Sequence, residues 1–562
     1  MSWEEFNKIS HFLYEYIDTY AKEKPDAIAL IDADDGKKVT WKEFANAVDI
    51  FTLDLIKMGL RKGDIIISSL PFLLEQVYLE FACFKIGALF CPLDLRLKAS
   101  EIVRSVDLLK ARAKMYVHLG NTDRADFADF AKDVQRRCSY LDFFLQFSMP
   151  EDCNKNTISI LDFISEAREN WREASIDGTL PKTINEARTK VEDDDPILII
   201  YTTGTTGFPK PAMLTNRGIT AQNLCLSRGF NFTNEDRMLV NLPPSHVGGQ
   251  TEQLMTTIFT GGISVLLHIF DAEKSLQAIN NYKATVLGQI PAMFEMQWRL
   301  ENYNDFDLSS LIFAIYGGQS VSKPFLEKLS TMAPKFGSGL GLTEISGFCS
   351  YTPLEGSIND IMESLGYDFP ISPLSIRKPM NADGTAGDEL PDGEIGEICY
   401  TGPQVFKGYF GNEKATRKTI SLEGVLYTGD LGYKDGKGLH LVGRSKFVIK
   451  PKGYQIYPPE VEAIIEEMPE IGKAAIVGAK HKIYSEGVVA FIELKKGKTV
   501  TKEQIMEHCK GIAAYKRPSL IMFLDEIPLN RVQKTDYKTL LEEVGKYIQE
   551  ARSRGEWDEE KK

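Results

Sequence analysis

Residues 196–214 read PILIIYTTGTTGFPKPAML, an apolar run followed by threonines, glycines and Lys210. The apolar run indicates a buried strand, and a loop at the end of a buried parallel strand is where open α/β sheets usually bind ligands. The threonine hydroxyls and unhindered glycine amides of residues 202–207 suit phosphate oxygens, and Lys210 adds a positive charge. We interpret the stretch as a phosphate-binding loop, with a purely structural glycine turn as the alternative.

The loop departs from the mononucleotide-binding pattern G-x-x-x-x-G-K-[ST]. Gly204 and Gly207 are three residues apart, and Pro211 follows Lys210 directly. The sequence therefore predicts phosphate-binding chemistry without the geometry of that pattern.

Helical and strand-like patterns alternate along most of the chain, which predicts an α/β architecture with partly parallel sheets. Residues 39–59 have helical spacing, residues 64–70 resemble a buried strand, and residues 82–97 pass from helix to strand. Further strand-like runs follow at 197–202, 262–270, 284–291, 311–318 and 393–402. Residues 120 to 190 are polar, and we expect an irregular peripheral excursion there.

The pattern changes after Arg444. PPEVEAIIEEM at 458–468 predicts a helix that begins with proline, and KAAIVGA and GVVAFIEL predict two strands before a helical run at 503–514. We expect a large N-terminal domain at 1–443 with mixed β-sheets flanked by helices. A hinge at 444–446 would join it to a small α+β domain at 447–562, a length within the common range for domains.

The bulk composition excludes several classes of protein. The net charge is −13, from 66 Lys and Arg against 79 Asp and Glu, so we expect no nucleic-acid partner. The eight cysteines show no zinc-site spacing and no disulfide density, which is typical of reduced core residues. The stretch MSWEEFNKIS carries two acids and no apolar core segment, so we expect no secretory signal, and the apolar stretch at 65–74 is too short to cross a bilayer. We expect a cytoplasmic protein without a transmembrane segment.

A series of stretches in fixed order resembles the AMP-forming, adenylate-forming enzymes, the superfamily of acyl- and aryl-CoA synthetases, adenylation domains and beetle luciferases. Besides the 201–214 loop they are GALFCPLDLRL (87–97), LPPSHVGG (242–249), YGGQS (316–320), GLGLTE (339–344), GEIGEI (393–398), GPQVFKGYF (402–410), YTGD (427–430), GRSKFVIKPKGYQIYPPEVE (443–462), YKRP (515–518) and PLNRVQKTDY (528–537). The likeness extends over most of the chain.

The resemblance implies a nucleotide site with a magnesium ion. The implied nucleotide-binding residues are Thr202, Thr203, Gly204, Thr205, Thr206, Gly207, Lys210, Gly317, Gly318, Gln319, Leu340, Asp430 and Arg444. Asp430 would accept the ribose hydroxyls, and Arg444 would contact ribose or phosphate. Leu340 departs from the family, in which an aromatic often stacks on adenine. Thr343 and Glu344 are implied at the catalytic centre, with Glu344 and Thr202 as magnesium ligands.

The resemblance also implies roles near the C-terminus. Lys534 resembles the lysine that stabilises charge during adenylate formation, although Gln533 stands where the family usually has glycine. Lys446 falls at the family's hinge. Lys452, Gly453 and Tyr454 would line the tunnel for the pantetheine thiol of CoA.

The acyl pocket is implied at His246, Val247, Gly248 and Gly341. His246 would be catalytic, at the entrance between the acyl and thiol channels. Val247 argues against an amino acid substrate, because relatives that activate amino acids tend to place an aspartate there to pair the ammonium. Gly341 stands where acetate-activating relatives have tryptophan, so a longer or aromatic acid should fit.

We therefore expect an acyl-CoA synthetase that uses ATP, Mg²⁺ and CoA on a medium-chain, branched or aromatic carboxylic acid. Two alternatives stay open. In the first, the acyl group goes to a carrier-protein pantetheine or another acceptor instead of CoA. In the second, the protein is a catalytically weak nucleotide-binding regulator, an alternative suggested by Gln533 and Leu340.

Overall fold

The computed structural model describes residues 2–123, 125–202, 209–451, 455–483, 485–530 and 534–558. The chain divides into two compact units. The first comprises Met1–Thr202, Lys210–Leu374 and Tyr400–Leu426, and the second comprises 203–209, Ser375–Cys399 and Tyr427–Lys562. The hinge expected at 444–446 falls within the second unit, and the predicted domain boundaries stay a prediction.

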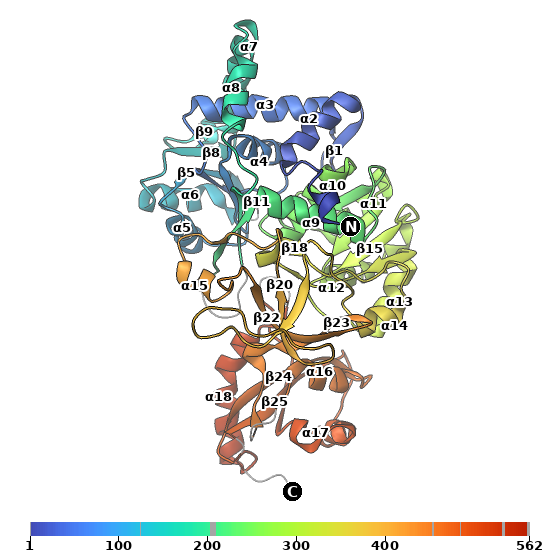
Figure 1. Ribbon diagram of the computed structural model, residues 1–562. Coiled ribbons are helices and arrows are strands. Elements are labelled where there is room, and N and C mark those ends of the chain that lie inside the picture. Colours follow the sequence, from blue (N-terminus) through green and yellow to red (C-terminus); the bar gives the residue numbers. More distant parts are fainter. Residues whose placement is uncertain are drawn as a thin grey trace. The chain divides into compact units, whose positions relative to one another are not determined.

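The first unit contains two large sheets (Figure 1). The strands of the seven-stranded sheet, in spatial order, are β16 (Lys335–Gly337), β15 (Phe313–Tyr316), β14 (Val286–Gln289), β12 (Arg237–Val240), β13 (Ile263–Leu266), β1 (Ile28–Asp32) and β2 (Lys38–Thr40). All neighbours in it are parallel except β1 and β2. Parallel strands are buried on both faces, which explains the unbroken apolar runs of the sequence.

The eight-stranded sheet carries the phosphate-loop stretch. Its strands, in spatial order, are β21 (Gly408–Tyr409), β11 (Pro211–Thr215), β10 (Pro196–Tyr201), β4 (Leu89–Pro92), β3 (Ile65–Ser69), β5 (Ala113–Leu119), β8 (Phe143–Phe147) and β9 (Ile158–Ser159). The strands from β10 to β9 are parallel, whereas β11 returns antiparallel beside β10 and β21 beside β11. The predicted strand at 197–202 is confirmed, and the predicted loop begins where β10 ends.

Helices surround these sheets. They are α1 (Trp3–Phe6), α2 (Leu13–Glu23), α3 (Trp41–Lys57), α4 (Leu74–Ile86), α5 (Ala99–Leu108), α6 (Phe127–Arg137), α7 (Ile160–Ile176), α8 (Leu180–Arg188), α9 (Asn216–Gly229), α10 (Thr256–Thr260), α11 (Ala272–Tyr282), α12 (Pro291–Trp298), α13 (Lys323–Met332), α14 (Ile358–Glu363) and α15 (Glu413–Arg417). A capping box between Thr40 and Glu43 starts α3, and Gly87 ends α4 with φ of +72°.

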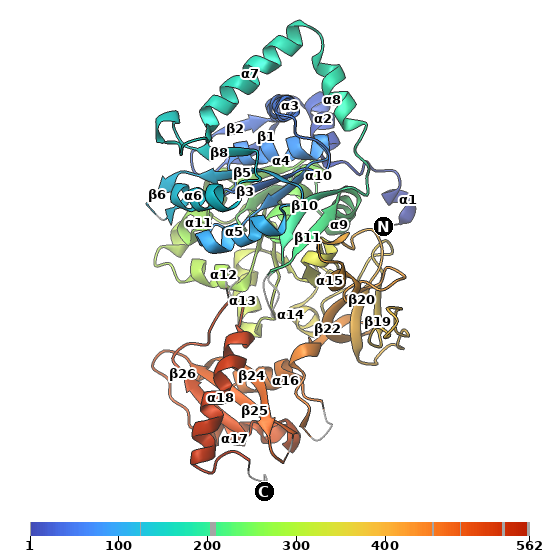
Figure 2. The same cartoon turned by 90° about the vertical axis from the view of Figure 1, so that its left-hand side faces the viewer.

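The expectation of an irregular segment at 120–190 is wrong. Those residues form α6, β8, α7 and α8, and β8 extends the eight-stranded sheet beside β5. Figure 2 shows α7 and α8 as a pair of helices at the outer edge of the first unit. Few residues of α7 and α8 are buried against the rest of the unit, so the apolar side of each helix is narrow. The mainly polar composition therefore conceals the helical period in the sequence.

The second unit contains two smaller sheets. One has the order β19 (Leu374–Arg377), β20 (Gly396–Tyr400), β22 (Leu426–Asp435) and β23 (Gly438–Arg444), and the other has β24 (Ile471–His481), β25 (Ser485–Leu494) and β26 (Leu520–Leu524). Its helices are α16 (Pro458–Glu466), α17 (Lys502–His508) and α18 (Tyr537–Ser553).

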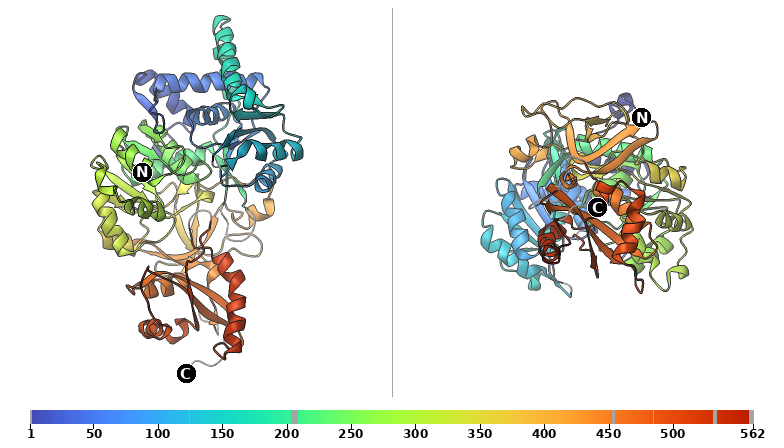
Figure 3. Two further views of the ribbon diagram at one scale, coloured as in Figure 1. Left: turned by 180° about the vertical axis from the view of Figure 1, so that it is seen from behind. Right: turned by 90° about the horizontal axis from the view of Figure 1, so that it is seen from below.

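Both faces of the three-stranded sheet are covered (Figure 3). Along β24, Ala474 and Ile476 pack with residues of α16 and α17, whereas Ala475 and Val477 pack with residues of α18. The period of two along a strand produces this division. The α+β character predicted for the C-terminal region is confirmed.

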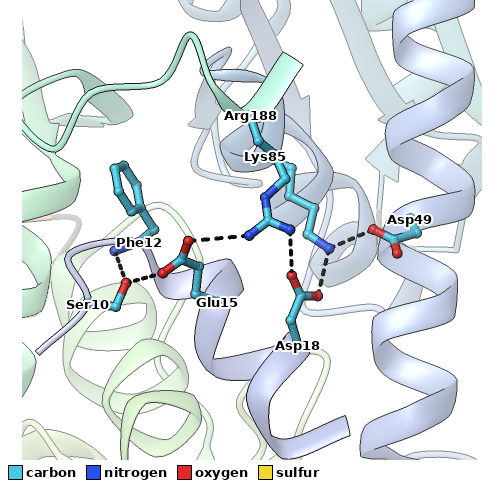
Figure 4. A network of polar contacts seen from close by, with 7 residues as sticks. All are labelled: Ser10, Phe12, Glu15, Asp18, Asp49, Lys85 and Arg188. Atoms are coloured by element: carbon cyan, nitrogen blue, oxygen red, sulfur yellow. Dashed lines mark hydrogen bonds and ion pairs between the residues drawn. The ribbon is translucent and has the colours of Figure 1, made fainter. Parts of the chain in front are cut away.

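A buried ion-pair network joins four helices of the first unit (Figure 4). The ammonium of Lys85 on α4, whose side chain is 1% exposed, lies 2.8 Å from Asp18 on α2 and 2.6 Å from Asp49 on α3. Arg188 on α8 contacts the other oxygen of Asp18 at 3.1 Å and Glu15 at 3.3 Å. Burial raises the pKa of Asp49, and the charge of Lys85 opposes that rise.

Replacing Lys85 with methionine should destabilise the first unit strongly. The substitution leaves Asp18 without one cation and the half-buried Asp49 without its ion-pair partner, and breaking such a pair costs about 3–5 kcal/mol when it is buried. We expect the thermal midpoint to fall by about 5–10 °C in a melt followed by circular dichroism.

The matched control is Lys114→Met, which breaks a half-exposed pair with Asp142 at 2.8 Å. It should leave the midpoint almost unchanged, because exposed pairs contribute little. Adding Asp49→Asn to Lys85→Met should recover part of the loss. Equal effects of the two lysine substitutions would contradict a structural role for the Lys85 network.

Candidate active site

The predicted site residues of the first unit follow the carboxyl ends of parallel strands. His246 and Val247 come after β12, Gly317 and Gly318 after β15, and Leu340 after β16. Because β12, β15 and β16 run parallel in one sheet, their carboxyl ends meet at one edge. The topology therefore brings segments that are up to about a hundred residues apart to one side of the sheet.

Thr202 and Lys210 mark the two ends of the phosphate loop. The Thr202 amide donates to the carbonyl of Lys210 at 2.9 Å, and the Lys210 amide donates to Oγ1 of Thr202 at 3.4 Å. These bonds continue the antiparallel ladder of β10 and β11 by one residue and close the base of the loop. The other predicted loop residues, Thr203, Gly204, Thr205, Thr206 and Gly207, lie outside the described residues.

One tyrosine connects Lys210 to Glu344. The hydroxyl of Tyr409 donates to Oε1 of Glu344 at 2.6 Å, and the ammonium of Lys210 lies 4.1 Å from the centre of the Tyr409 ring. Burial, followed by the charge of Glu344, raises the pKa of Tyr409 far above its ordinary value, so the phenol keeps its proton as a donor. The ammonium of Lys210 and the carboxylate of Glu344 are thus held by opposite parts of one side chain.

Tyr409 belongs to the motif GPQVFKGYF, but the sequence alone predicts no role for it. Strand pairing explains the contact: β21 pairs with β11, and Tyr409 stands opposite Ala212, which is two residues after Lys210. That pairing joins segments nearly two hundred residues apart, and no local pattern in the sequence predicts it.

Glu344 lies in the turn of a short hairpin. β17 (Gly341–Leu342) pairs with β18 (Gly347–Phe348), and Thr343–Ile345 forms a 3₁₀ turn between them. The carbonyl of Glu344 accepts from the Phe406 amide at 3.0 Å. Glu344 and Thr343 are both half-buried, so their oxygens stay within reach of a ligand.

The donor set fits Mg²⁺. Glu344 and the hydroxyls of Thr343 and Thr202 offer hard oxygen atoms, which this cation prefers. Within the described ranges Glu344 makes no ion pair. One carboxylate oxygen held by Tyr409 orients the group for a metal ion.

Leu340 and Gly341 differ in exposure. Leu340 is 9% exposed, and its amide donates to Oγ of Ser350 at 2.9 Å. Gly341 is exposed, and a Cβ there would lie 3.2 Å from the carbonyl oxygen of Gly347. A side chain at this position therefore requires a small shift of the hairpin.

His246 caps the turn before an unusual helix. Nδ1 of His246 accepts from the Gly248 amide at 3.0 Å, and the π-helix η2 (Gly248–Met255) follows Val247. With Nδ1 as acceptor, the ring proton is on Nε2. Val247 is buried, whereas His246 is half-buried. Extended π-helices are rare and are often found at functional sites.

The loop after β15 is largely exposed. Gly317 is half-buried against the ring of Phe348, and Gly318 and Gln319 are exposed. Gly318 has φ of +90°, a conformation that favours glycine.

The second unit brings together Asp430, Arg444 and Lys534. β22 and β23 form a hairpin in which Asp430 stands opposite Arg444, and Nε of Arg444 lies 2.7 Å from Oδ1 of Asp430. Asp430 is 3% exposed. The β22–β23 hairpin thus accounts for the spacing of fourteen residues between Asp430 and Arg444.

Lys534 is held near this pair. Burial lowers its pKa most, the charge of Arg444 lowers it further, and Asp430 opposes both. The Lys534 amide donates to Oδ1 of Asn530 at 3.1 Å, and its carbonyl accepts from the Asn530 amide at 2.7 Å. These two bonds hold the backbone of Lys534 against Asn530. Gln533, with the positive φ suspected there, lies outside the described residues.

Of the other residues predicted to act in the C-terminal region, the structure describes Lys446. Lys446 lies in a 3₁₀ turn (Ser445–Phe447) directly after β23, an element end of the kind at which hinges occur. The predicted tunnel residues Lys452, Gly453 and Tyr454 lie outside the described residues.

All eight cysteines are unpaired, and seven of them are buried. Over the described part of the chain, no helix combines the length and the apolar character needed to span a bilayer.

Comparison with known proteins identifies the family. Residues 17–410 match the AMP-binding enzymes, and residues 460–534 match the AMP-binding enzyme C-terminal domain. A 4-coumarate–CoA ligase of Pinus taeda is 28% identical over 530 residues, 92% of this chain and 92% of that protein. An indoleacetate–CoA ligase of Aromatoleum aromaticum is 29% identical over 476 residues, 83% of this chain and 86% of that protein.

The fold has close counterparts among solved structures. The crystal structure of ATP-bound MatB from Rhodopseudomonas palustris gives a TM-score of 0.77 at 24% identity, over 95% of this chain and 99% of that one. The predicted fold class is therefore confirmed. Because the AMP-binding match covers well over half of the residues, this chain belongs to the family of AMP-binding enzymes, in which the two relatives named above are CoA ligases.

Proposed function

We propose that the protein is an ATP-dependent, AMP-forming acyl-CoA synthetase that activates a medium-chain, branched or aromatic carboxylic acid. The observation that carries the proposal is the arrangement of Lys210, Tyr409 and Glu344. It places an ammonium suited to phosphate and a carboxylate suited to Mg²⁺ on one tyrosine, at the end of the strand that leads into the phosphate loop.

The first half-reaction makes an acyl-adenylate. A carboxylate oxygen of the substrate attacks the α-phosphorus of ATP, the bond to the bridging oxygen breaks, and pyrophosphate leaves. Lys210 and the loop donors bind the phosphates, and Lys534 stabilises the negative charge that develops at the α-phosphate. Glu344, with Thr202, would hold Mg²⁺, which when bound neutralises phosphate charge.

The second half-reaction transfers the acyl group. The CoA thiolate attacks the acyl carbon, the bond from that carbon to the AMP oxygen breaks, and AMP leaves with the electron pair. Asp430 would hold the ribose through both steps, and Lys452, Gly453 and Tyr454 would guide the pantetheine. Lys446 is the proposed hinge about which the C-terminal domain changes its pose.

The proposed substrate class follows from the residues at the acyl pocket. Val247 is buried and apolar, so an α-ammonium would find no charged partner in that side chain. Gly341 leaves its position without a side chain. The names of relatives that act on coumarate and indoleacetate support an aromatic or similarly extended acid.

A pyrophosphate-release screen tests the proposal. The purified protein is incubated with MgATP, CoA and a panel of aliphatic and aromatic acids, and thioester and AMP are quantified. Release that depends on an added acid, with formation of acyl-CoA, is the expected result. Adenylate without thioester would favour delivery to a carrier-protein pantetheine instead. No release with any acid would favour a nucleotide-binding regulator.

Lys534→Ala should separate the two half-reactions. We expect the rate of pyrophosphate release to fall by about two to three orders of magnitude, because a cation at the developing charge is lost. The rate of thioester formation from supplied acyl-AMP should stay near wild type. Equal loss in both assays would show that Lys534 has another role.

Tyr409→Phe should weaken the magnesium dependence of adenylate formation. The variant keeps a ring beneath Lys210 but removes a hydrogen bond to a carboxylate, which contributes about 1.5–3 kcal/mol. The half-saturating Mg²⁺ concentration in the pyrophosphate assay should rise about tenfold.

The matched control for Tyr409→Phe is Tyr20→Phe, which removes a hydroxyl that donates to the Phe259 carbonyl at 3.0 Å. It should not change the Mg²⁺ requirement. A shift of the same size in both variants would mean that Tyr409 acts only on stability.

Gly341→Trp should shift the preference toward short acids. The indole would fill volume that the glycine leaves open, and the hairpin must move slightly to relieve the 3.2 Å contact of the new Cβ. The measurement is kcat/KM for acetate, hexanoate and decanoate. A chain-length profile identical to wild type would remove Gly341 from the acyl pocket.

A further inference from the structure

Glu80 is a carboxyl group enclosed within the first unit. It lies on α4, where every residue from Gln76 to Ile86 is buried, and its side chain is 0% exposed. Nε2 of Gln250 on η2 donates to Oε2 of Glu80 at 3.2 Å. Desolvation raises the pKa of Glu80 to about 8, and the hydrogen bond from Gln250 only partly opposes that rise. Neither of the two proposed half-reactions uses this group.

Two oxygen atoms of this pair match one another. Across the described residues, Oε1 of Glu80 and Oε1 of Gln250 are both buried and have no hydrogen-bond partner. An ionised carboxylate has only acceptors and cannot satisfy the amide oxygen, whereas a protonated carboxyl group carries one donor. The two side chains are therefore fully complementary only when Glu80 is neutral.

The surroundings of Glu80 favour the neutral form. Among the described residues, no cation contributes to the pKa shift of Glu80. Cys83 follows about one turn along α4, and burial, followed by the charge of Glu80, raises the pKa of its thiol well above the ordinary value. Lys85, on the same helix, pairs with Asp18 and Asp49. An anion at Glu80 would thus be buried without a counter-ion, which is costly.

Gln250 connects Glu80 to the predicted catalytic residue His246. The backbone amide of Gln250 donates to the carbonyl of His246 at 3.1 Å, while its side chain donates to Glu80. Gly248 and Gly249 have no side chains, so Gln250 is the first residue of η2 that a side-chain contact can hold. The position of the backbone at His246 therefore depends on the contact between Gln250 and Glu80.

We propose that Glu80 is a positioning residue that, in its protonated form, pairs with Gln250 and so keeps His246 in place for the reaction. The inference rests on the proposed function and adds a pH-dependent control to it. Loss of the proton removes the donor of Glu80 and leaves a buried anion, so the pair is disrupted. Gln250 would pass the displacement to His246 through its backbone amide.

The pH dependence of turnover tests this inference. Glu80→Gln keeps the shape of the side chain, and its amide supplies a donor for Gln250, but it has no proton to lose. The measurement is kcat for acid-dependent pyrophosphate release from about pH 6 to about pH 9. The ratio of wild type to variant, in which the titration of substrates cancels, should be constant up to about pH 7. It should fall about tenfold by about pH 9, because one unit above its pKa about a tenth of a group is protonated.

The matched control is Glu75→Gln, which replaces a half-buried carboxyl group on the same helix. Its pH profile should match that of wild type. A ratio of wild type to Glu80→Gln that is constant over the whole range overturns the inference. An alkaline change of equal size in Glu75→Gln overturns it as well.

A double substitution separates positioning from stability. Glu80→Leu combined with Gln250→Leu removes both polar groups together, so the thermal midpoint should change little. The value of kcat should nevertheless fall about tenfold, because η2 loses the side-chain contact nearest to His246, whereas KM for ATP should stay near wild type. Wild-type kcat in this variant would show that the pair has no positioning role.

A further readout needs no turnover. The ordinary pKa of Glu80 is 4.5, and in the folded protein it is about 8. The stability that the neutral group contributes is therefore fully present below about pH 4.5 and is lost as the pH rises to about 8. The thermal midpoint of Glu80→Gln should exceed that of wild type by more at about pH 8 than at about pH 5. An equal difference at the two pH values contradicts the neutral state of Glu80.

The two proposals fail separately. Absence of pyrophosphate release with any acid contradicts the proposed function, and the midpoint comparison still decides whether Glu80 is neutral in the pair. Release with a pH-independent ratio of wild type to Glu80→Gln contradicts only the inference about Glu80.

Discussion

Backbone hydrogen bonding between parallel strands is the constraint on which the site in the first unit depends. Strands that run in the same direction end at the same edge, so the loops after β12, β15 and β16 must share one side of the seven-stranded sheet. The predicted phosphate loop has the same origin in the other sheet, where β10 ends at Tyr201. Short loops at strand ends expose amides and glycines that would be costly to bury unpaired.

Charges at this edge are held by few, specific contacts. Tyr409 places a carboxylate at its hydroxyl and an ammonium at its ring, so two groups of opposite sign keep defined positions without neutralising one another directly. In the second unit, Asp430 and Arg444 pair across a hairpin, and burial disfavours the charged form of Lys534. Groups whose charge is disfavoured in the unliganded protein are suited to a ligand that supplies the opposite charge.

The Lys85 network shows how ionisable groups can join helices within the protein. Lys85 meets two carboxylates from neighbouring helices and thereby joins α2, α3, α4 and α8. This arrangement is a structural element of the first unit.

The sequence alone determined the α/β class, most strands of the two sheets and the family. Buried parallel strands are unbroken apolar runs, and the ordered motifs are local, so both can be recognised without coordinates. It also indicated Glu344, Lys210 and Lys534 as charged groups of the site. It failed at 120–190, where helices with a narrow apolar side lack a clear period. Only the tertiary structure decided that Tyr409 joins Lys210 to Glu344 and that Arg444 faces Asp430. These facts depend on strand pairing and packing between segments distant in the chain, and a linear pattern carries no record of such contacts.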